Sequence, residues 1–138
     1  MAAVRTFLDT GVLIAAYRGQ TDEARKAFEL LNDADREFIA STFLKLELIP
    51  QPTWHSRQTE IDFYNKYFAG VQHYAPASET LAESALEKAG LHGLEAMDAL
   101  HVAVAAHFGA AEFITTEKLT KPIHRLSSPK VIYLPNWS

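Results

Sequence analysis

The sequence predicts an α/β fold with three layers, α/β/α, in which helices cover both faces of a central parallel sheet of about five strands. Short apolar runs alternate along the chain with longer segments whose apolar residues recur at helical spacing, a pattern typical of strands joined by crossover helices. The length of 138 residues suits one core, so we expect a single domain over residues 1–138. A composition of 48% hydrophobic and 22% charged residues is that of a globular protein.

The first part of the chain contains two strand–helix units. Thr21 or Asp22, and Ser41 or Thr42, offer side-chain oxygens that cap two helices, Gly19 stops the first helical run, and Pro50 and Pro52 are expected to end the last. The predicted elements are a strand at 4–8, a helix at 11–17, a helix from 21 or 22 to 31, a strand at 37–40, and a helix from 41 or 42 through 47.

The second part continues the alternation. Glycines at 70, 90 and 109 are expected to end its three helices, and Ser78 is expected to cap the middle one. The predicted elements are a helix at 60–68, a short strand at 71–74, a helix from 78 to 90, a helix from about 94 to 108, and strands at 112–115 and 131–134.

Composition excludes several classes of function. The chain has no cysteine, which excludes disulfides, thiolate metal sites and cysteine nucleophiles. No apolar run approaches the roughly 20 residues that span a bilayer, so we expect no membrane association and a cytoplasmic protein. Lys plus Arg is 13 and Asp plus Glu is 17, a net charge of −4 that argues against a broad basic surface for nucleic acid.

An acid, Asp9, interrupts the apolar stretch "RTFLDTGVLIAAY" directly after the first predicted strand. Ligands of open parallel sheets gather beyond the carboxyl ends of the strands, near the point where the strand order reverses. Asp is also a common helix N-cap, so Asp9 alone is explained equally well as the cap of the next helix.

Three further acids follow other predicted elements. Glu47 lies in an apolar helix but, taken singly, is better explained as a surface residue beside Lys45. Asp98 interrupts the apolar helix "EAMDALHVAVAAHF", where a buried carboxylate needs a cation, a metal or a proton. Glu117 follows Thr115 and Thr116 and is alternatively an acid in the first turn of a helix. Four oxygen ligands would suit a hard cation, Mg²⁺ or Mn²⁺.

Taken together, these segments resemble a PIN domain, the nuclease fold of many VapC-type toxins. The stretches "FLDTGVLIA", "STFLKLEL", "MDALHVAVA" and "FITTEKL" look like the four motifs of the family, and the resemblance covers nearly the whole chain. It implies that Asp9, Glu47, Asp98 and Glu117 are the catalytic metal ligands. Thr10, Thr115 and Thr116 would support them.

The sequence departs from the family pattern at two positions. Gly11 stands where the family often has Asn, which would weaken one polar contact in the first motif. Glu117 stands where Asp is usual, and its extra methylene could move the carboxylate by about an ångström.

The activity implied by the resemblance is hydrolysis of RNA phosphodiester bonds with the help of Mg²⁺ or Mn²⁺. The protein would be the toxin of a toxin–antitoxin pair, with RNA as substrate and a cognate antitoxin as partner. We also expect a homodimer, because the aromatic stretch "IDFYNKYF" places apolar residues on more than one face of a helix. The alternative is a catalytically weak or inactive PIN-like module that binds RNA or a protein.

Other enzyme classes fit less well. A haloacid-dehalogenase-type phosphatase needs a second Asp where Gly11 stands, and a receiver-like domain needs an Asp after the third strand, where "QHYAPA" has none. His101, three residues after Asp98, is either a further ligand or a hydrogen-bonded core residue. Glu95 is either an auxiliary acid on the same helix face or an acid placed to favour the helix dipole.

Overall fold

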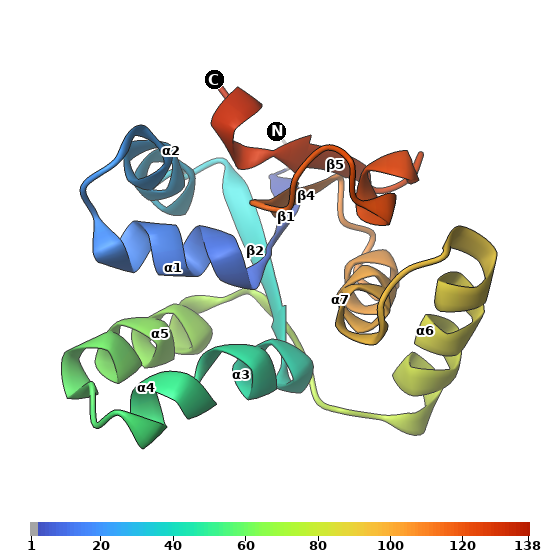
Figure 1. The fold of residues 1–138 in the computed structure, drawn as a ribbon, viewed down its shortest axis with the longest axis horizontal. Helices are drawn as coiled ribbons and strands as arrows, with labels where there is room; N and C mark the ends of the chain where they lie inside the picture. The colour runs from blue at the N-terminus through green and yellow to red at the C-terminus, as the bar shows by residue number, and fades with distance from the viewer. Residues whose placement is uncertain (1–2) are drawn as a thin grey trace.

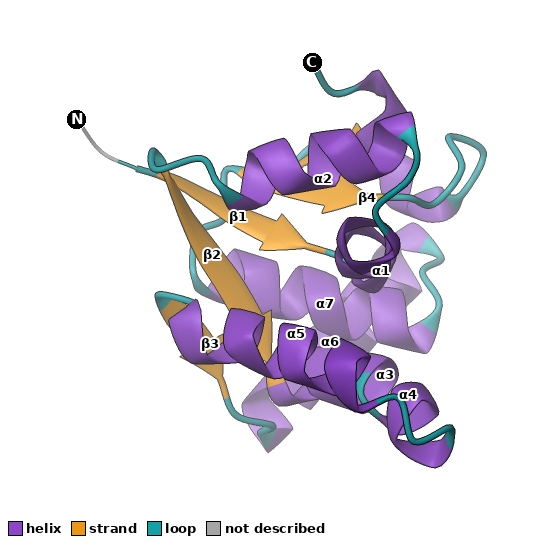
Figure 2. Ribbon diagram, turned by 90° about the vertical axis from the view of Figure 1, so that its left-hand side faces the viewer, coloured by secondary structure: helices purple, strands orange, loops and turns teal. Residues whose placement is uncertain are grey.

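The structure is a computed structural model that describes residues 3–138. A five-stranded, all-parallel sheet runs through its centre in the order β3-β2-β1-β4-β5 (Figures 1 and 2). The strands are β1 (Val4–Leu8), β2 (Arg36–Ser41), β3 (His73–Ala75), β4 (Glu112–Thr115) and β5 (Lys130–Tyr133). The parallel sheet predicted from the alternation of strands and helices is therefore confirmed.

Helices occupy both sides of this sheet. Figure 1 shows α1, α2 and α5 to one side of the strands and α6 and α7 to the other. The α-helices are α1 (Thr10–Arg18), α2 (Asp22–Leu31), α3 (Thr42–Leu48), α4 (Pro50–Trp54), α5 (Gln58–Gly70), α6 (Glu79–His92) and α7 (Ala96–His107). Two 3₁₀ turns, η1 (Pro122–Arg125) and η2 (Leu134–Asn136), flank β5. The three predicted layers are confirmed.

The core lies where both helical layers meet the central strands. Phe7 on β1 and Phe113 on β4 stack with ring centroids 4.8 Å apart, and both side chains are fully buried. The apolar sequence of α7 is explained by its place in the core, since six of its residues are buried from solvent: Ala99, His101, Val102, Ala103, Val104 and Ala105. The C-terminal segment joins the same core through Leu134, which is fully buried.

The strand order places a switch point between β1 and β4. The chain proceeds outward from β1 to β2 and β3, and then returns to place β4 on the other side of β1. Leu8 pairs with Ile114, and the Asp9 backbone N–H donates to the Ile114 carbonyl at 3.0 Å. Residues that follow β1 and β4 therefore emerge side by side, at the edge where ligands of such sheets bind.

Two predicted helix boundaries were wrong. Pro50 and Pro52 were expected only to end a helix, but α3 ends at Leu48 and Pro50 begins the separate helix α4. Proline suits a first helical position, because the missing N–H has no partner there in any case. Gly90 lies inside α6, which continues to His92 and is capped by Gly93, whose φ of 66° is left-handed.

The aromatic stretch in α5 packs largely on the protein's own core. Tyr64 and Phe68 are buried, and Ile61, Phe63 and Tyr67 are half-buried. Much of the apolar surface from which the sequence predicted a homodimer is therefore covered by the protein itself. Among residues 3–138, no helix is long and apolar enough to cross a bilayer.

At the other end of the sheet, Arg36 joins three elements. Its guanidinium donates to Glu112 at 2.7 Å, to Thr6 at 2.8 Å and to Asp33 at 3.0 Å. The Arg36 side chain is only 9% exposed, so loss of the cation would leave partly buried carboxylates without a counter-charge.

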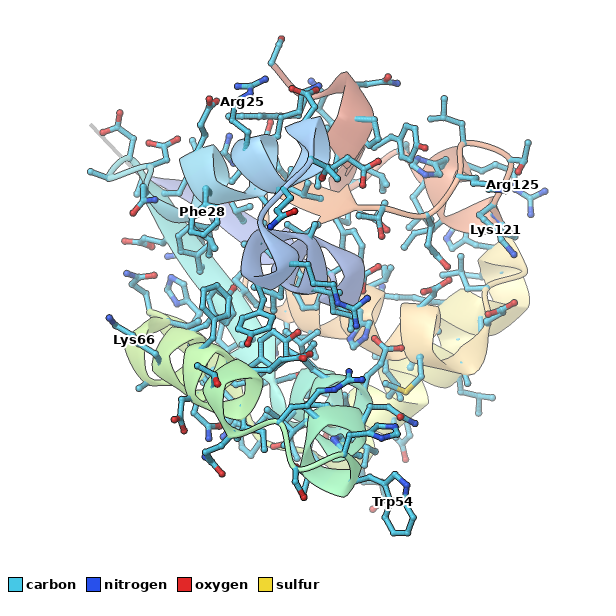
Figure 3. The ribbon with its side chains drawn as sticks, turned by 60° about the vertical axis from the view of Figure 1, so that its left-hand side comes forward. Arg25, Phe28, Trp54, Lys66, Lys121 and Arg125 are labelled. Atoms are coloured by element: carbon cyan, nitrogen blue, oxygen red, sulfur yellow. The ribbon has the colours of Figure 1, made fainter. Side chains whose placement is uncertain are left out.

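We therefore predict that Arg36→Met lowers the free energy of unfolding by roughly 2 kcal/mol, as expected when charged hydrogen bonds are lost. Urea denaturation measures the change. The matched control is Arg25→Met, because Arg25 pairs with Asp22 and Glu29 on the outer surface of α2 (Figure 3) and should leave the midpoint almost unchanged. Equal effects in the two variants would contradict the structural role of Arg36.

Candidate metal centre

Asp9 begins the site at the carboxyl end of β1. It is the N-cap of α1, and its Oδ1 accepts a hydrogen bond from the Thr10 backbone N–H at 2.8 Å. Its Oδ2 accepts from the Thr115 hydroxyl at 2.9 Å. Burial raises the pKa of Asp9 above its usual range, although His101 and these two donors lower it in part. The prediction of Asp9 as a helix cap is therefore confirmed, and one of its carboxylate oxygens also lies close to Glu47 and His101.

Glu47 approaches Asp9 from α3. Ser41 ends β2 and caps α3 by accepting from the Leu44 N–H at 3.1 Å, which sets the direction in which the helix leaves the sheet. Glu47 Oε1 accepts from the Thr10 hydroxyl and from His101 Nε2, the latter at 3.0 Å. The hydrogen bond from His101 lowers the pKa of Glu47 and outweighs the opposing effect of burial. Glu47 is therefore held as a carboxylate rather than free on the surface.

Asp98 and Glu117 form a facing pair of carboxyl groups. Asp98 lies in the first turn of α7 and Glu117 in the loop after β4. Burial and the facing Glu117 raise the pKa of Asp98 to about 7. Burial also raises the pKa of Glu117, in part offset by its contact with Asp98. The pair therefore retains a proton close to neutral pH unless a cation replaces it.

The loop after β4 is fixed by its own hydrogen bonds. The Glu117 N–H donates to the Thr115 hydroxyl at 3.1 Å, and His124 Nε2 lies 2.6 Å from the Glu117 carbonyl oxygen. No regular helix follows Glu117, since residues 116–121 form turns before η1. The alternative of Glu117 as an acid in the first turn of a helix is therefore wrong.

Gly11 and Thr116 fit each other closely. A Cβ built on Gly11 would lie 1.8 Å from Thr116 Oγ1 and 3.0 Å from Thr116 Cβ. A larger side chain at residue 11 would thus require the loop after β4 to move. The Thr116 hydroxyl occupies the space that a side chain on residue 11 would need, which explains why this chain has glycine there.

The donors fit a divalent cation. Two groups have ligand atoms that all lie within 4.8 Å of one another: Asp9 with Asp98 and Glu117, and Asp9 with Glu47 and His101. Glu117 Oε2 is buried without a hydrogen-bond partner among residues 3–138. A buried carboxylate oxygen with no donor is costly unless a proton or a cation meets it. Oxygen-rich sites of this kind suit Mg²⁺ and Mn²⁺.

The structure therefore brings together the residues that the sequence singled out. Asp9 lies in both groups, so the four acids, which come from four different elements, meet in two groups that share Asp9: Asp98 and Glu117 on one side, and Glu47 with His101 on the other. Thr10 and Thr115 bond two of them directly. Asp98, in the first turn of α7, is half-buried rather than fully buried.

His101 is the residue whose place the sequence left open. It is fully buried and lies 3.0 Å from Glu47 and 4.0 Å from Asp9. The only signal in the sequence was a histidine one turn after Asp98 on an otherwise apolar helix. Glu95, in contrast, is exposed at the N-cap of α7 and forms no side-chain cap. Its charge helps to raise the pKa of Glu117.

Several solved structures have a fold similar to that of this chain. A toxin–antitoxin complex from Klebsiella pneumoniae has a TM-score of 0.65 at 18% identity, with 94% of this chain and 97% of that chain covered. The VapBC2 complex from Rickettsia felis, solved bound to a promoter DNA fragment, has a TM-score of 0.69 at 14% identity, covering 94% and 98%.

A third structure is VapC20 from Mycobacterium tuberculosis, a toxin that cleaves the sarcin–ricin loop. Its TM-score is 0.65 at 16% identity, and 78% of this chain and 86% of that chain are covered. These likenesses show a shared fold. No curated protein matches the sequence. The family model of the PIN domain matches residues 6–119, and the chain belongs to the PIN domain family.

Proposed function

We propose that the protein is a metal-dependent ribonuclease that hydrolyses phosphodiester bonds in RNA with Mg²⁺ or Mn²⁺. The observation that carries this proposal is the convergence of Asp9, Asp98 and Glu117 at the switch point, with a buried Glu117 oxygen that lacks a partner. PIN domains are typically nucleases, and one protein of similar fold is described as cleaving the sarcin–ricin loop.

Within this proposal, Asp9, Glu47, Asp98 and Glu117 would hold the cation. A bound Mg²⁺ or Mn²⁺ would acidify a water molecule and neutralise charge on the phosphate oxygens. The protein's own residues orient the ligand carboxylates and control their protonation. Thr115 and the Thr10 N–H hold the two oxygens of Asp9, so that its carboxylate keeps one orientation. The Asp98–Glu117 pair can release its proton when the cation binds.

The test is cleavage of single-stranded RNA by the purified protein with and without divalent cations. We expect cleavage with Mg²⁺ or Mn²⁺ and none after the cations are chelated. Activity that is undiminished in excess EDTA would overturn the proposal. An intact, folded protein that binds RNA but does not cut it under any cation would instead support a non-catalytic PIN-like module.

Variants of Glu117 test its role as a ligand. We predict that Glu117→Asp keeps or raises cleavage, because it preserves the carboxylate and restores the residue usual in the family. Glu117→Gln should lower cleavage, since it removes the charge at constant length. Steady-state cleavage rates of the three proteins at saturating Mg²⁺ measure the effect. Equal rates would show that residue 117 is not a ligand.

The proposal also includes a protein partner and a cellular compartment. The protein would be the toxin of a toxin–antitoxin pair, because two solved structures of similar fold are complexes of that kind. It would act in the cytoplasm, where an RNA-cleaving toxin meets its substrate.

Residues 1–138 would fold as one domain, since β5 pairs with β4 and Leu134 packs into the common core. Coincident unfolding transitions by fluorescence and circular dichroism would support one domain.

We also propose a homodimer, now on a different surface. Leu46 and Trp54 are 66% and 82% exposed, and both line a mostly apolar groove of about 700 Å³ between α3, α4 and α5. Figure 3 shows Trp54 projecting from the body of the protein. Exposed apolar patches of this kind often mark protein interfaces.

We predict a dimer at tens of micromolar, and Trp54→Ser combined with Leu46→Ser should shift it towards monomer. Static light scattering measures the mass. The matched control is Leu86→Ser, which changes an exposed leucine on α6, away from this groove. A monomeric wild-type protein would count against the dimer.

A further inference from the structure

His101 is a buried polar side chain to which the proposed chemistry assigns no role. It lies on α7, one turn after Asp98, and its ring centroid is 5.3 Å from that of Phe7 in the core. Its Nε2 lies 3.0 Å from Glu47 Oε1, and its Nδ1 is buried without a partner among residues 3–138. A histidine in such a place needs a reason beyond packing, because an apolar residue would fill the space without leaving a nitrogen unpaired.

The geometry decides which ring nitrogen carries the hydrogen. Glu47 Oε1 can only accept, so an Nε2 lone pair facing it at 3.0 Å would be repelled. Nε2 must therefore donate. A hydrogen on Nδ1 would be a buried donor with no acceptor, which is rarer and less favourable than an unused lone pair. We assign the Nε2–H tautomer on these grounds.

This hydrogen bond restrains a side chain that would otherwise be mobile. Glu47 lies on a helix of seven residues, and its side chain is 33% exposed. A free glutamate of this kind has many rotamers available. Thr10 and His101 both donate to the same oxygen, Oε1. They fix the carboxylate next to Asp9 and leave Oε2 available to a cation.

We infer that His101 is a positioning residue that orients the Glu47 carboxylate for cation binding, and that it is not itself a ligand. The inference rests on the proposed function. A ligating histidine nearly always donates its second ring nitrogen to a carboxylate, a carbonyl or water. Here Nδ1 has no such acceptor, and Nε2 is already committed to Glu47. The group of Asp9, Glu47 and His101 is thus two ligands and their support.

The first test is the tautomer of His101 in ¹⁵N-labelled protein, measured by long-range ¹H–¹⁵N correlation spectra. We expect the Nε2–H form in EDTA and the same form after Mg²⁺ is added. Loss of the Nε2 proton on adding Mg²⁺ would show that His101 is a ligand and overturn the inference. An Nδ1–H form in EDTA would overturn it as well. The EDTA spectrum needs no metal, so it tests the hydrogen bond even if the proposed function is wrong.

The second test compares two substitutions by calorimetric titration with Mn²⁺. His101→Gln places an amide N–H near the position of Nε2 and should keep an affinity close to that of the wild type. His101→Met fills the same space without a donor and should weaken Mn²⁺ binding about 10–100-fold, the usual effect of losing a residue that orients a ligand. The control is His107→Gln at the exposed end of α7, which should have no effect.

The outcomes separate the inference from the proposed function. Rescue by Gln but not by Met supports a positioning role, and similar losses in both variants support a ligand role and overturn the inference. Wild-type affinity in both variants would reduce His101 to a core residue, which also overturns it. A wild-type protein that binds no Mn²⁺ overturns the proposed function, while the tautomer spectrum still decides the His101–Glu47 hydrogen bond.

Discussion

Asp98→Asn is expected to reduce metal-dependent RNA cleavage by at least about a thousandfold. A cation held by carboxylates supplies several kcal/mol of charge stabilisation in the transition state, and each 1.36 kcal/mol corresponds to a factor of ten in rate. Asn keeps the shape of Asp98 but cannot carry the charge that faces Glu117 and Asp9. Single-turnover cleavage of single-stranded RNA at saturating Mg²⁺ measures the loss.

The matched control for this variant is Asp35→Asn. Asp35 is exposed before β2, at the opposite end of the sheet, so the same chemical change there should leave cleavage unaltered. The folded state of both variants can be checked by thermal unfolding. Full activity of a folded Asp98→Asn protein would show that Asp98 is a structural acid and would remove the central ligand from the proposed site.

Mg²⁺ is expected to stabilise the wild-type protein strongly at neutral pH and to leave Asp98→Asn almost unchanged. At about 100 times its dissociation constant, a ligand that binds only the folded state adds about 2.7 kcal/mol to the free energy of unfolding. Thermal unfolding with and without Mg²⁺ measures the shift. If both proteins melt at the same temperature with and without Mg²⁺, no specific cation site exists.

The carboxyl groups of the site should also make the stability of the metal-free protein depend on pH. The pKa of Asp98 is raised from 3.8 to about 7, and the pKa values of Asp9 and Glu117 are raised as well. The folded state thus keeps protons that the unfolded chain has already lost. Its stability is expected to fall as the pH rises between about 4 and about 7.

One residue of the site acts in the other direction. The pKa of Glu47 is lowered, so its contribution is present above the pKa of the unfolded chain and is lost as the pH falls. Melting temperatures in EDTA, compared between wild type and Asp98→Asn at each pH, isolate the effect of the Asp98–Glu117 pair. We expect the variant to be at least as stable as the wild type near neutral pH. A variant that melts well below the wild type there would indicate an Asp98 held by ordinary hydrogen bonds.

The elements of this fold could be predicted from the sequence because their signals are local. Alternating apolar runs and helical spacing predicted each strand and both helical layers, Ser78 was predicted as a cap, and Ser41 was one of two candidates for another. The errors arose where one residue type has two uses. Pro50 begins a helix, and Gly90 lies within one, because the position of proline or glycine in a helix depends on where the neighbouring turns pack.

The acids of the candidate site could also be predicted from the sequence, but the residues that contact them could not. Asp9 and Glu117 each follow a predicted strand, and parallel strands end at a common edge, so their convergence could be expected. The sequence could not predict that Asp98 would face Glu117 or that His101 would donate to Glu47. The roles of these residues as metal ligands remain predictions.

By itself, the sequence determined the alternation of strands and helices, the single apolar core and the acids that follow the strands, since each depends on neighbours within a few residues. Only the tertiary structure decided the strand order, which puts β4 beside β1 and so joins residues more than a hundred positions apart, such as Asp9 and Thr115. It likewise decided that His101 meets Glu47 across 54 positions. Such contacts depend on how separate elements pack around the sheet, and no local periodicity encodes that arrangement.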